Sequence, residues 1–477
     1  MPVHRAVRSV APFLLALPLL AGCATPLAAA PLTAAPPAET ASRQNIDSTD
    51  PTSRGALARE AVSEDRESAA AAIARLRAAG QPGLDSLFRA HAEVITRLGS
   101  PEGPAADPEA LRVREALEKV ARQRDAHASR LYWHTDLASA RAAARASGKP
   151  ILSLRLLGNL DEELSCANSR FFRTALYPNT EVGAALRSRF VLHWKSERPA
   201  PLVTVDFGDG RKLTRTVTGN SIHYVLDPEG RVVDAVPGMY GAKAFLRALD
   251  AAESAYRNTR EADDETRREA LRSYHAERAF SLASGWAALL GVPIEAPLSP
   301  VKSDDSAPPA NLAVMTAVPK AAVEAPIVQA VQATPVIPLP DPSNAEAWTA
   351  LIDSFEQEVR LDAASRAFMR SKIAADIDLD GKAMKPLDDA SFEKKLRAFE
   401  RAIAEDTARN EYGMHRVLHG WMAMTPPPEE LEAFNERVYA SLFLTPRSDP
   451  WLGLLVKEAY SGIEREGVRL GGGGRAR

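Results

Sequence analysis

The chain has 477 residues, and its 59 Lys and Arg residues nearly balance its 62 Asp and Glu residues, giving a formal net charge of -3. A chain so close to neutral lacks the basic surface with which proteins bind phosphate backbones, so nucleic acid is excluded as a partner. The length exceeds what one compact core holds and predicts two or three domains, and two cysteines exclude a disulfide-stabilised scaffold.

Residues 1–22 have the pattern of an export signal. Arg5 and Arg8 form a basic start, and the apolar run that follows is too short to span a bilayer as a helix. The run ends in Leu-Ala-Gly before Cys23, which resembles the lipobox of bacterial lipoproteins. That resemblance implies cleavage before Cys23, a diacylglyceryl group on its sulfur and an N-acyl chain of the palmitate kind, which together anchor a protein stably in a membrane. Ala24, where an inner-membrane lipoprotein would have Asp, implies the periplasmic side of the outer membrane. The alternative is an ordinary secretory signal in which Cys23 is incidental.

The next two segments differ sharply in composition. Residues 23–52 are rich in Ala, Pro, Ser and Thr without helical or strand period, which predicts a disordered tether. Residues 53–129 predict a helical module, with a first helix starting near Ser63 and a third over residues 108–132. His91 lies on the apolar face of the second helix, so we expect a core or boundary histidine there.

Residues 130–260 predict an α/β domain with a late antiparallel pair of strands. A hairpin is expected to be inserted at residues 201–217, with its turn at Asp209-Gly210. The expected helices are residues 138–147, a helix after Cys166, 180–189 and 242–256, and the expected strands are residues 151–157, 190–194, 222–226 and 232–236.

This domain resembles the thioredoxin superfamily, in particular the thioredoxin-like domains of exported bacterial proteins. The residues that carry the resemblance are Trp133 with the alanine-rich helix after it, Gly148-Lys149-Pro150-Ile151, Cys166-x-x-Ser169, the run from Val182 to Val191, and the run from Val225 to Val232. The implied fold is an α/β thioredoxin-like central domain flanked by all-α N- and C-terminal regions. The alternative is another small α/β domain.

Two departures from the family pattern bear on the chemistry. Ser169 stands where the resolving cysteine would be, and Ser221 stands where the family has a cis-proline facing the redox site. A non-proline cis bond is costly, so we expect a trans bond before Ser221. Cys166 is left as a single thiol at a helix start, where backbone N–H groups favour a thiolate. The candidate catalytic residues are therefore Cys166 and Ser169.

The C-terminal half divides at a proline-rich stretch. Residues 261–292 predict a helix, and eleven prolines in residues 293–342 predict an extended linker. Residues 343–466 predict a helical domain, and residues 467–477 predict a loose tail.

A short acidic run in the C-terminal region suggests calcium. Asp376, Asp378 and Asp380 precede Gly381, an arrangement that resembles the first half of an EF-hand loop. The twelfth position is Leu387 where a bidentate Glu belongs, although Asp388 or Asp389 can replace it from one or two residues further on. The alternative is a solvated acidic turn.

One glutamate and two histidines in the C-terminal region are spaced as metal ligands on one side of a helix would be. Glu411, His415 and His419 follow one another at i, i+4 and i+8, a spacing that can hold zinc, but the HExxH order is missing. The favoured interpretation is two boundary histidines on an amphipathic helix. His193 and His223 lie on predicted strands, where we expect them to pack rather than react.

Together these patterns predict a lipid-anchored periplasmic protein, held in the membrane through Cys23, that serves as a non-catalytic scaffold or interaction module for other envelope proteins. The alternative is a monothiol thiol-disulfide exchange protein that uses Cys166 without a resolving partner.

Overall fold

The computed structural model describes residues 50–98, 107–216, 219–290, 345–374, 387–424 and 430–450. They form a mixed α/β structure in which helices predominate and a four-stranded mixed sheet lies in the centre. Cys23 and the acidic run of Asp376, Asp378 and Asp380 lie outside the described residues, so the lipid anchor and the calcium loop stay predictions.

Six helices form the N-terminal module, which has a hydrophobic core of its own. The first helix was missed by the sequence reasoning, which placed the start near Ser63. Its signals are Asp50, whose carboxylate accepts a hydrogen bond from the Ser53 N–H, and Pro51 at the first helical position. The helices are α1 (Pro51–Glu60), α2 (Arg66–Ala78), α3 (Gln81–Ala90), α4 (Ala92–Leu98), α5 (Pro108–Ala121) and α6 (Ala126–Ser129).

The helix expected over residues 108–132 is interrupted. Helix α5 ends at Ala121 because Arg122 and Asp125 adopt left-handed backbone conformations, with φ of 55° and 61°. The break lets the Asp125 carboxylate accept a hydrogen bond of 2.6 Å from Arg173 of the central domain. His91 lies in the module core as expected, with Nε2 2.9 Å from the Ala58 carbonyl oxygen.

The central sheet has the strand order β2-β1-β5-β6. Strand β1 runs parallel to β2 and antiparallel to β5, and β6 runs antiparallel to β5. Every residue of β1, β5 and β6 is buried, which explains their continuous apolar runs. The strands are β1 (Ile151–Leu157), β2 (Val191–Arg198), β5 (Ser221–Leu226) and β6 (Val232–Pro237).

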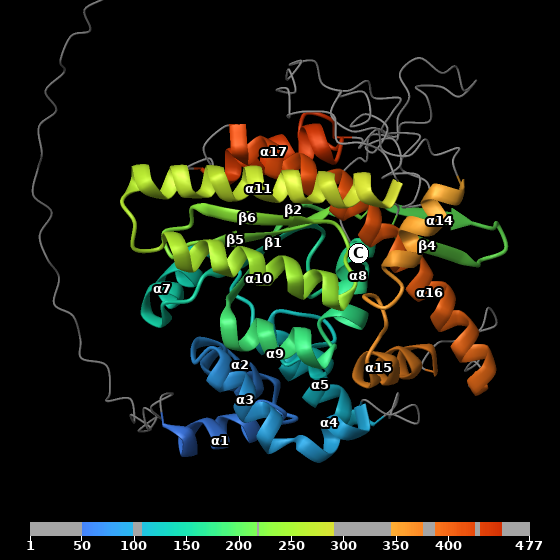
Figure 1. Ribbon diagram of the computed structural model, residues 1–477. Helices are drawn as coiled ribbons and strands as arrows, with labels where there is room; N and C mark the ends of the chain where they lie inside the picture. Colours follow the sequence, from blue (N-terminus) through green and yellow to red (C-terminus); the bar gives the residue numbers. More distant parts are fainter. Residues whose placement is uncertain are drawn as a thin grey trace, which may run out of the picture. The chain divides into compact units, whose positions relative to one another are not determined.

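Helices cover both faces of this sheet (Figure 1), with α10 on one side and α11 with α17 on the other. Phe245 and Leu249 of α10 are buried in the core, and Arg267 of α11 donates to the Val232 carbonyl oxygen on β6. The helical elements of this part are α7 (Leu137–Ser147), α8 (Ala167–Phe171), the π-helical turn η1 (Phe172–Leu176), α9 (Thr180–Arg189), α10 (Ala242–Thr259) and α11 (Asp264–Leu290).

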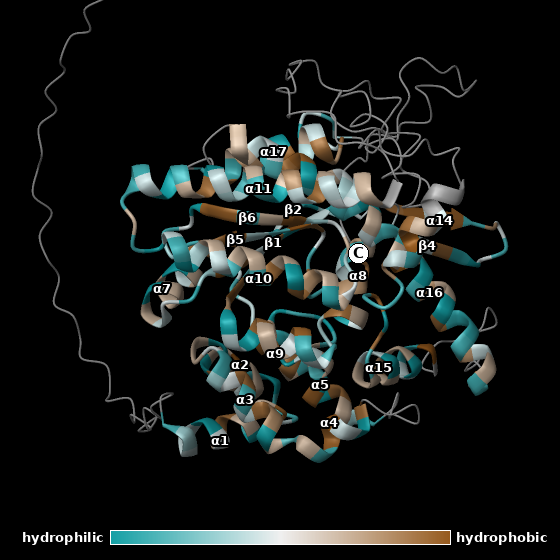
Figure 2. Cartoon of the chain, in the orientation of Figure 1, coloured by the Kyte–Doolittle hydropathy of each residue, from teal (hydrophilic) through white to brown (hydrophobic). Residues whose placement is uncertain are grey.

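The expected inserted hairpin is confirmed as a separate two-stranded sheet of β3 (Leu202–Asp206) and β4 (Lys212–Thr216). Its turn contains Gly210 at a φ of 94°. Strand β3 is mainly apolar (Figure 2), and several of the large apolar side chains exposed on the described part of the chain lie in this hairpin. They are Leu202, Val203, Val205, Phe207 and Leu213.

The C-terminal helices share one hydrophobic core with the central sheet. Buried residues from Leu131 through Trp286 and on to Leu444 belong to a single cluster, so the described C-terminal helices pack on the α/β part. None of the described helices is both long and apolar enough to cross a membrane. The elements are α14 (Ala345–Ser354), α15 (Ala363–Ala374), α16 (Asp389–Arg409), η2 (Asn410–His415), α17 (Arg416–Met424), α18 (Leu431–Arg437) and η3 (Val438–Leu442).

Candidate functional site

Cys166 occupies the N-cap position of α8 and is fully buried. Its sulfur accepts a hydrogen bond of 3.4 Å from the backbone N–H of Ser169. The Ser169 hydroxyl lies 2.5 Å from Ser165 Oγ and 3.0 Å from the Cys166 carbonyl oxygen. The hydroxyl is therefore engaged with other groups, and the backbone of Ser169 supplies the contact to the thiol.

Two basic residues around Cys166, Arg173 and Arg155, have partners of their own. Arg173 bonds to Asp125 and to the Glu163 carbonyl oxygen. Arg155, which has no exposed side-chain surface, is held between Glu197 at 3.1 Å and Glu432 at 2.9 Å. These two guanidinium groups balance carboxylates, so they are not reserved for stabilising a thiolate.

The loop that carries Ser221 packs against the start of α8. The Asn168 side-chain amide donates a 2.7 Å hydrogen bond to the Ser221 hydroxyl, and a Cβ at Gly219 would come within 2.9 Å of Asn168 Oδ1. Glycine is therefore required by the close approach of this loop. The peptide bond before Ser221 is trans, as expected.

The chain's own C-terminal segment covers this loop. The Tyr439 hydroxyl of η3 donates to the Asn220 carbonyl oxygen at 3.4 Å, and the Asn220 side chain donates to Thr445 Oγ1 at 3.1 Å. Asn220 and Tyr439 are both buried. These contacts close the loop beside Cys166 off from solvent. We call Cys166, Ser169 and the loop 219–221 the Cys166 site.

A second polar cluster is formed by residues of β6, η2 and α17. Asp234 of β6 faces His415 at the end of η2 and His419 of α17, and all three residues are buried. Asp234 Oδ1 lies 3.9 Å from His415 Nε2 and 3.9 Å from His419 Nδ1. One ligand atom from each residue can be chosen so that all three atoms lie within 4.8 Å of one another. Among the described residues, this is the group of His, Cys, Asp and Glu side chains that can hold a metal ion.

Two residues of α11 complete this cluster. The Tyr274 hydroxyl donates a 2.6 Å hydrogen bond to Asp234 Oδ2, and His275 Nδ1 lies 2.9 Å from His419 Nδ1. His275 Nε2 lies 3.1 Å from the Val233 carbonyl oxygen, which can only accept, so Nε2 carries the proton and Nδ1 carries a lone pair. We call Asp234, Tyr274, His275, His415 and His419 the Asp234 centre.

The helix that carries both histidines is fastened to the loop after β6. Asn410 of η2 donates a 2.6 Å hydrogen bond to the Met239 carbonyl oxygen. Gly238 has a φ of 76°, and a Cβ there would come within 2.5 Å of Asn410 Nδ2, so glycine is required by both conformation and space. These contacts fix where His415 and His419 stand relative to Asp234.

Burial shapes the protonation of the Asp234 centre. It lowers the pKa of His275 to about 4 and the pKa of His419 well below its usual range. Burial also acts to raise the pKa of Asp234, but the neighbouring imidazoles outweigh it and hold that pKa well below normal. Burial and the Asp234 charge raise the pKa of Tyr274, which keeps its hydroxyl as a donor. At neutral pH an ionised carboxylate therefore lies beside two neutral imidazoles.

Glu411 does not join the two histidines with which it is spaced. Its carboxylate accepts hydrogen bonds of 3.0 and 2.8 Å from Arg247 of α10. The sequence analysis favoured boundary positions for His415 and His419, but both are fully buried, because the sheet and α11 cover that side of the helix. It named neither Asp234 nor His275, which are distant in the chain. Sequence alone offers no signal for them, because a lone Asp on a strand and a lone His on a helix are common.

The remaining candidate residues have structural partners. His193 Nδ1 lies 2.8 Å from Ser153 Oγ and His223 Nε2 lies 2.8 Å from the Tyr177 hydroxyl, which confirms that both pack in the core. Asp388 caps α16 by accepting from the Ser391 N–H, and Asp389 pairs with Arg370 at 2.6 Å. The two carboxylates that could complete a calcium loop are thus already engaged.

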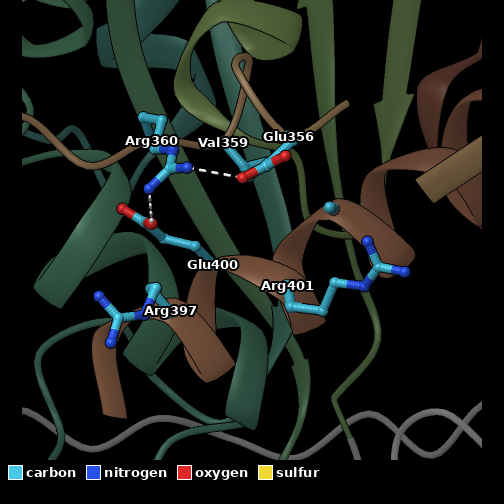
Figure 3. A pocket seen from close by; sticks show the side chains of 7 residues that line it. Glu356, Val359, Arg360, Arg397, Glu400 and Arg401 are labelled. Atoms are coloured by element: carbon cyan, nitrogen blue, oxygen red, sulfur yellow. Dashed lines mark hydrogen bonds and ion pairs between the residues drawn. The ribbon is translucent and has the colours of Figure 1, made fainter. Parts of the chain in front are cut away.

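A pocket lies between α16 and the segment after α14 (Figure 3). Its charged groups largely neutralise one another, since Arg360 bonds to Glu356 at 2.6 Å and to Glu400 at 3.3 Å. The lining consists of Glu356, Val359, Arg360, Arg397, Glu400, Arg401 and Ala404. The pocket contains no nucleophile or imidazole.

Comparison with models of protein families, with curated proteins and with solved structures found no significant match to this chain. The class that the coordinates define is a mixed α/β protein with two buried polar sites.

Proposed function

We propose that this chain is a lipid-anchored protein of the periplasmic side of the cell envelope, whose central thioredoxin-like domain is a non-catalytic scaffold. The lipid-anchor part rests on the residues that end in Cys23 and is a sequence argument throughout. The sheet supports the thioredoxin-like part, because its order β2-β1-β5-β6, with β5 and β6 forming the antiparallel pair, is the arrangement expected for that fold.

The closure of the Cys166 site carries the non-catalytic part of the proposal. A thiol that exchanges disulfides must reach a second sulfur in line with its own, which requires an open approach. Cys166 has no exposed surface, and Tyr439 with Thr445 covers the loop beside it. Cys166 stands at a helix start, as a redox cysteine would, but its surroundings are those of a packed core.

The exposed hairpin of β3 and β4 supports an interaction role. Soluble domains rarely leave large apolar side chains together on their surface unless that surface makes contacts. Phe207 is 56% exposed and Leu202 is 51% exposed. The hairpin is also a two-stranded sheet with two unpaired edges in the described part of the chain.

Thiol reactivity tests the proposal against the exchange enzyme. We expect alkylation of Cys166 in the native full chain to be about a hundredfold or more slower than in denaturant, because alkylation must await local opening. Cys23→Ser provides the matched control, since it removes the other cysteine and leaves Cys166 unchanged. Fast native alkylation, with mixed disulfides trapped on Cys166 in cells, would establish the exchange enzyme instead.

A pair of substitutions separates chemistry from packing. Cys166→Ala and Cys166→Ser both remove the thiol. Both variants are expected to restore normal growth and envelope function when expressed in a deletion strain. An exchange enzyme would lose function in both variants while remaining folded by circular dichroism.

A further inference from the structure

We propose that the Asp234 centre binds one divalent transition-metal ion of the zinc class, through one oxygen of Asp234 and one nitrogen each of His415 and His419. The proposal is independent of the proposed function, because it uses none of the residues of the Cys166 site.

The distances suit such an ion after small side-chain movements. Ligands of a tetrahedral zinc ion, bonded at about 2.0–2.1 Å, lie about 3.3 Å from one another. Asp234 Oδ1 lies 3.9 Å from His415 Nε2, so this gap needs to close by about 0.6 Å. His419 Nδ1, also 3.9 Å from that oxygen, donates to the lone pair of His275 Nδ1, so the ligand atom of His419 is its unpartnered Nε2. His415 and His419 are one helical turn apart, with stacked rings whose centroids are 4.3 Å apart.

Unpartnered nitrogen atoms point to a missing ligand. His415 Nε2 and His419 Nε2 are buried and make no hydrogen bond in the described part of the chain. Leaving a buried polar atom unpaired costs about 1–3 kcal/mol, and native proteins generally avoid it. No Lys or Arg of the described residues forms an ion pair with Asp234, so the carboxylate has no fixed cation beside it. A metal ion would give the His415 lone pair and the Asp234 charge a common partner.

The surrounding groups are those that orient metal ligands. Ligating carboxylates and imidazoles usually bond through their other atoms to neighbouring donors and acceptors. Asp234 Oδ2 accepts from the Tyr274 hydroxyl, and Asp234 Oδ1 accepts from the Ala235 N–H at 2.7 Å. His275 holds the ring of His419 through the 2.9 Å contact between their Nδ1 atoms.

The donor set and the burial define the class of ion and its role. Imidazole nitrogen with one carboxylate suits zinc and neighbouring transition metals, whereas calcium and magnesium prefer oxygen. The residues of the centre come from β6, α11, η2 and α17, so an ion there would tie the C-terminal helices to the sheet. These three protein ligands leave the fourth position of a tetrahedral ion to a water molecule.

The test uses the purified full chain, stripped with a chelator and then titrated with Zn²⁺ against a chromogenic chelator. We expect one Zn²⁺ per chain by elemental analysis. His415→Gln and His419→Gln should each weaken binding more than tenfold, and His134→Gln, a half-buried histidine outside the centre, should leave it unchanged.

Measurements on the unsubstituted chain keep the proposal testable if the variants fail to fold. Co²⁺ in place of Zn²⁺ should give the visible absorption of a four-coordinate ion, and X-ray absorption of the zinc form should show imidazole ligands. Less than a tenth of an equivalent of Zn²⁺ bound, or equal binding in all folded variants, or a spectrum of hydrated Co²⁺, would overturn the proposal.

Discussion

The Cys166 site and the Asp234 centre are both buried polar clusters covered by the C-terminal helices, yet their hydrogen bonding differs. At the Cys166 site the thiol and the Ser169 hydroxyl both have partners within the chain. At the Asp234 centre the Nε2 atoms of His415 and His419 have none among the described residues. The buried Asn168 Oδ1 next to the Cys166 site is unpaired as well, so what distinguishes the Asp234 centre is that its unpaired imidazole nitrogens lie beside a carboxylate.

The difference also shows that a site's position in a fold says little about its chemistry. Cys166 lies at the start of α8, where backbone N–H groups favour a thiolate, and the local packing removes the access that thiol exchange needs. His415 and His419 lie on an otherwise ordinary helix, and their chemistry depends on Asp234 of a strand far away in the chain.

Removing the ion should have the largest effect. With free Zn²⁺ at about a hundred times its Kd, a bound ion stabilises the native state by about 2.7 kcal/mol. Urea unfolding of the full chain should therefore show a higher midpoint in Zn²⁺ than in chelator. His419→Gln should unfold at the same midpoint in both solutions. Identical midpoints for the unsubstituted chain in Zn²⁺ and in chelator would show that the Asp234 centre binds no ion.

The substitution Cys166→Ala should destabilise the native state less than removal of the ion. Loss of one buried sulfur atom leaves a small cavity, so the free energy of unfolding should fall by about 1 kcal/mol. Cys166→Ser keeps an acceptor for the Ser169 N–H and serves as the matched variant. Chemical denaturation measures both, and a loss of biological function without a loss of stability would contradict the structural role of the thiol.

Acid should weaken one attachment of the C-terminal helices through Glu432. Partial burial acts to raise the pKa of Glu432, but Arg155 and Lys195 outweigh it and lower that pKa to about 2. The folded pKa lies below the unfolded value of about 4.3, so this stabilisation is complete above the unfolded value and is lost as pH falls towards 2.

The Glu432 side chain is half exposed, so the loss should stay below about 1 kcal/mol. Urea midpoints measured across this pH range should show it, and Glu432→Gln should lack this component of the pH dependence. A variant with the same acid slope as the unsubstituted chain would show that the Arg155 pair does not hold the C-terminal helices.

Polar substitutions in the hairpin should have the smallest effect on stability. Val203 and Phe207 are exposed, so Val203→Thr and Phe207→Ser should each change the free energy of unfolding by less than about 0.5 kcal/mol. Thermal unfolding checks this, with Phe172→Ala in the buried core as the contrasting variant. A large loss from either hairpin change would mean that these side chains are covered.

Much of the local structure followed from the sequence because its signals are local. The strand at Ile151–Leu157 and the helix over residues 138–147 were predicted, and the helix is found as α7 with Asp136 as its cap. The break after Ala121 was missed because left-handed conformations at Arg122 and Asp125 depend on tertiary contacts. The Asp234 centre could not be predicted as a whole. Helical spacing shows that His415 and His419 lie on one side of a helix, but it does not show that Asp234 of β6 faces them.

Native mass spectrometry of the full chain, treated with an alkylating reagent in the presence of Zn²⁺, tests both halves of the comparison at once. The account predicts a species that carries one zinc ion and no alkyl group on Cys166. A species alkylated at Cys166 without zinc would contradict it, because the thiol would then be accessible and the Asp234 centre would hold no ion.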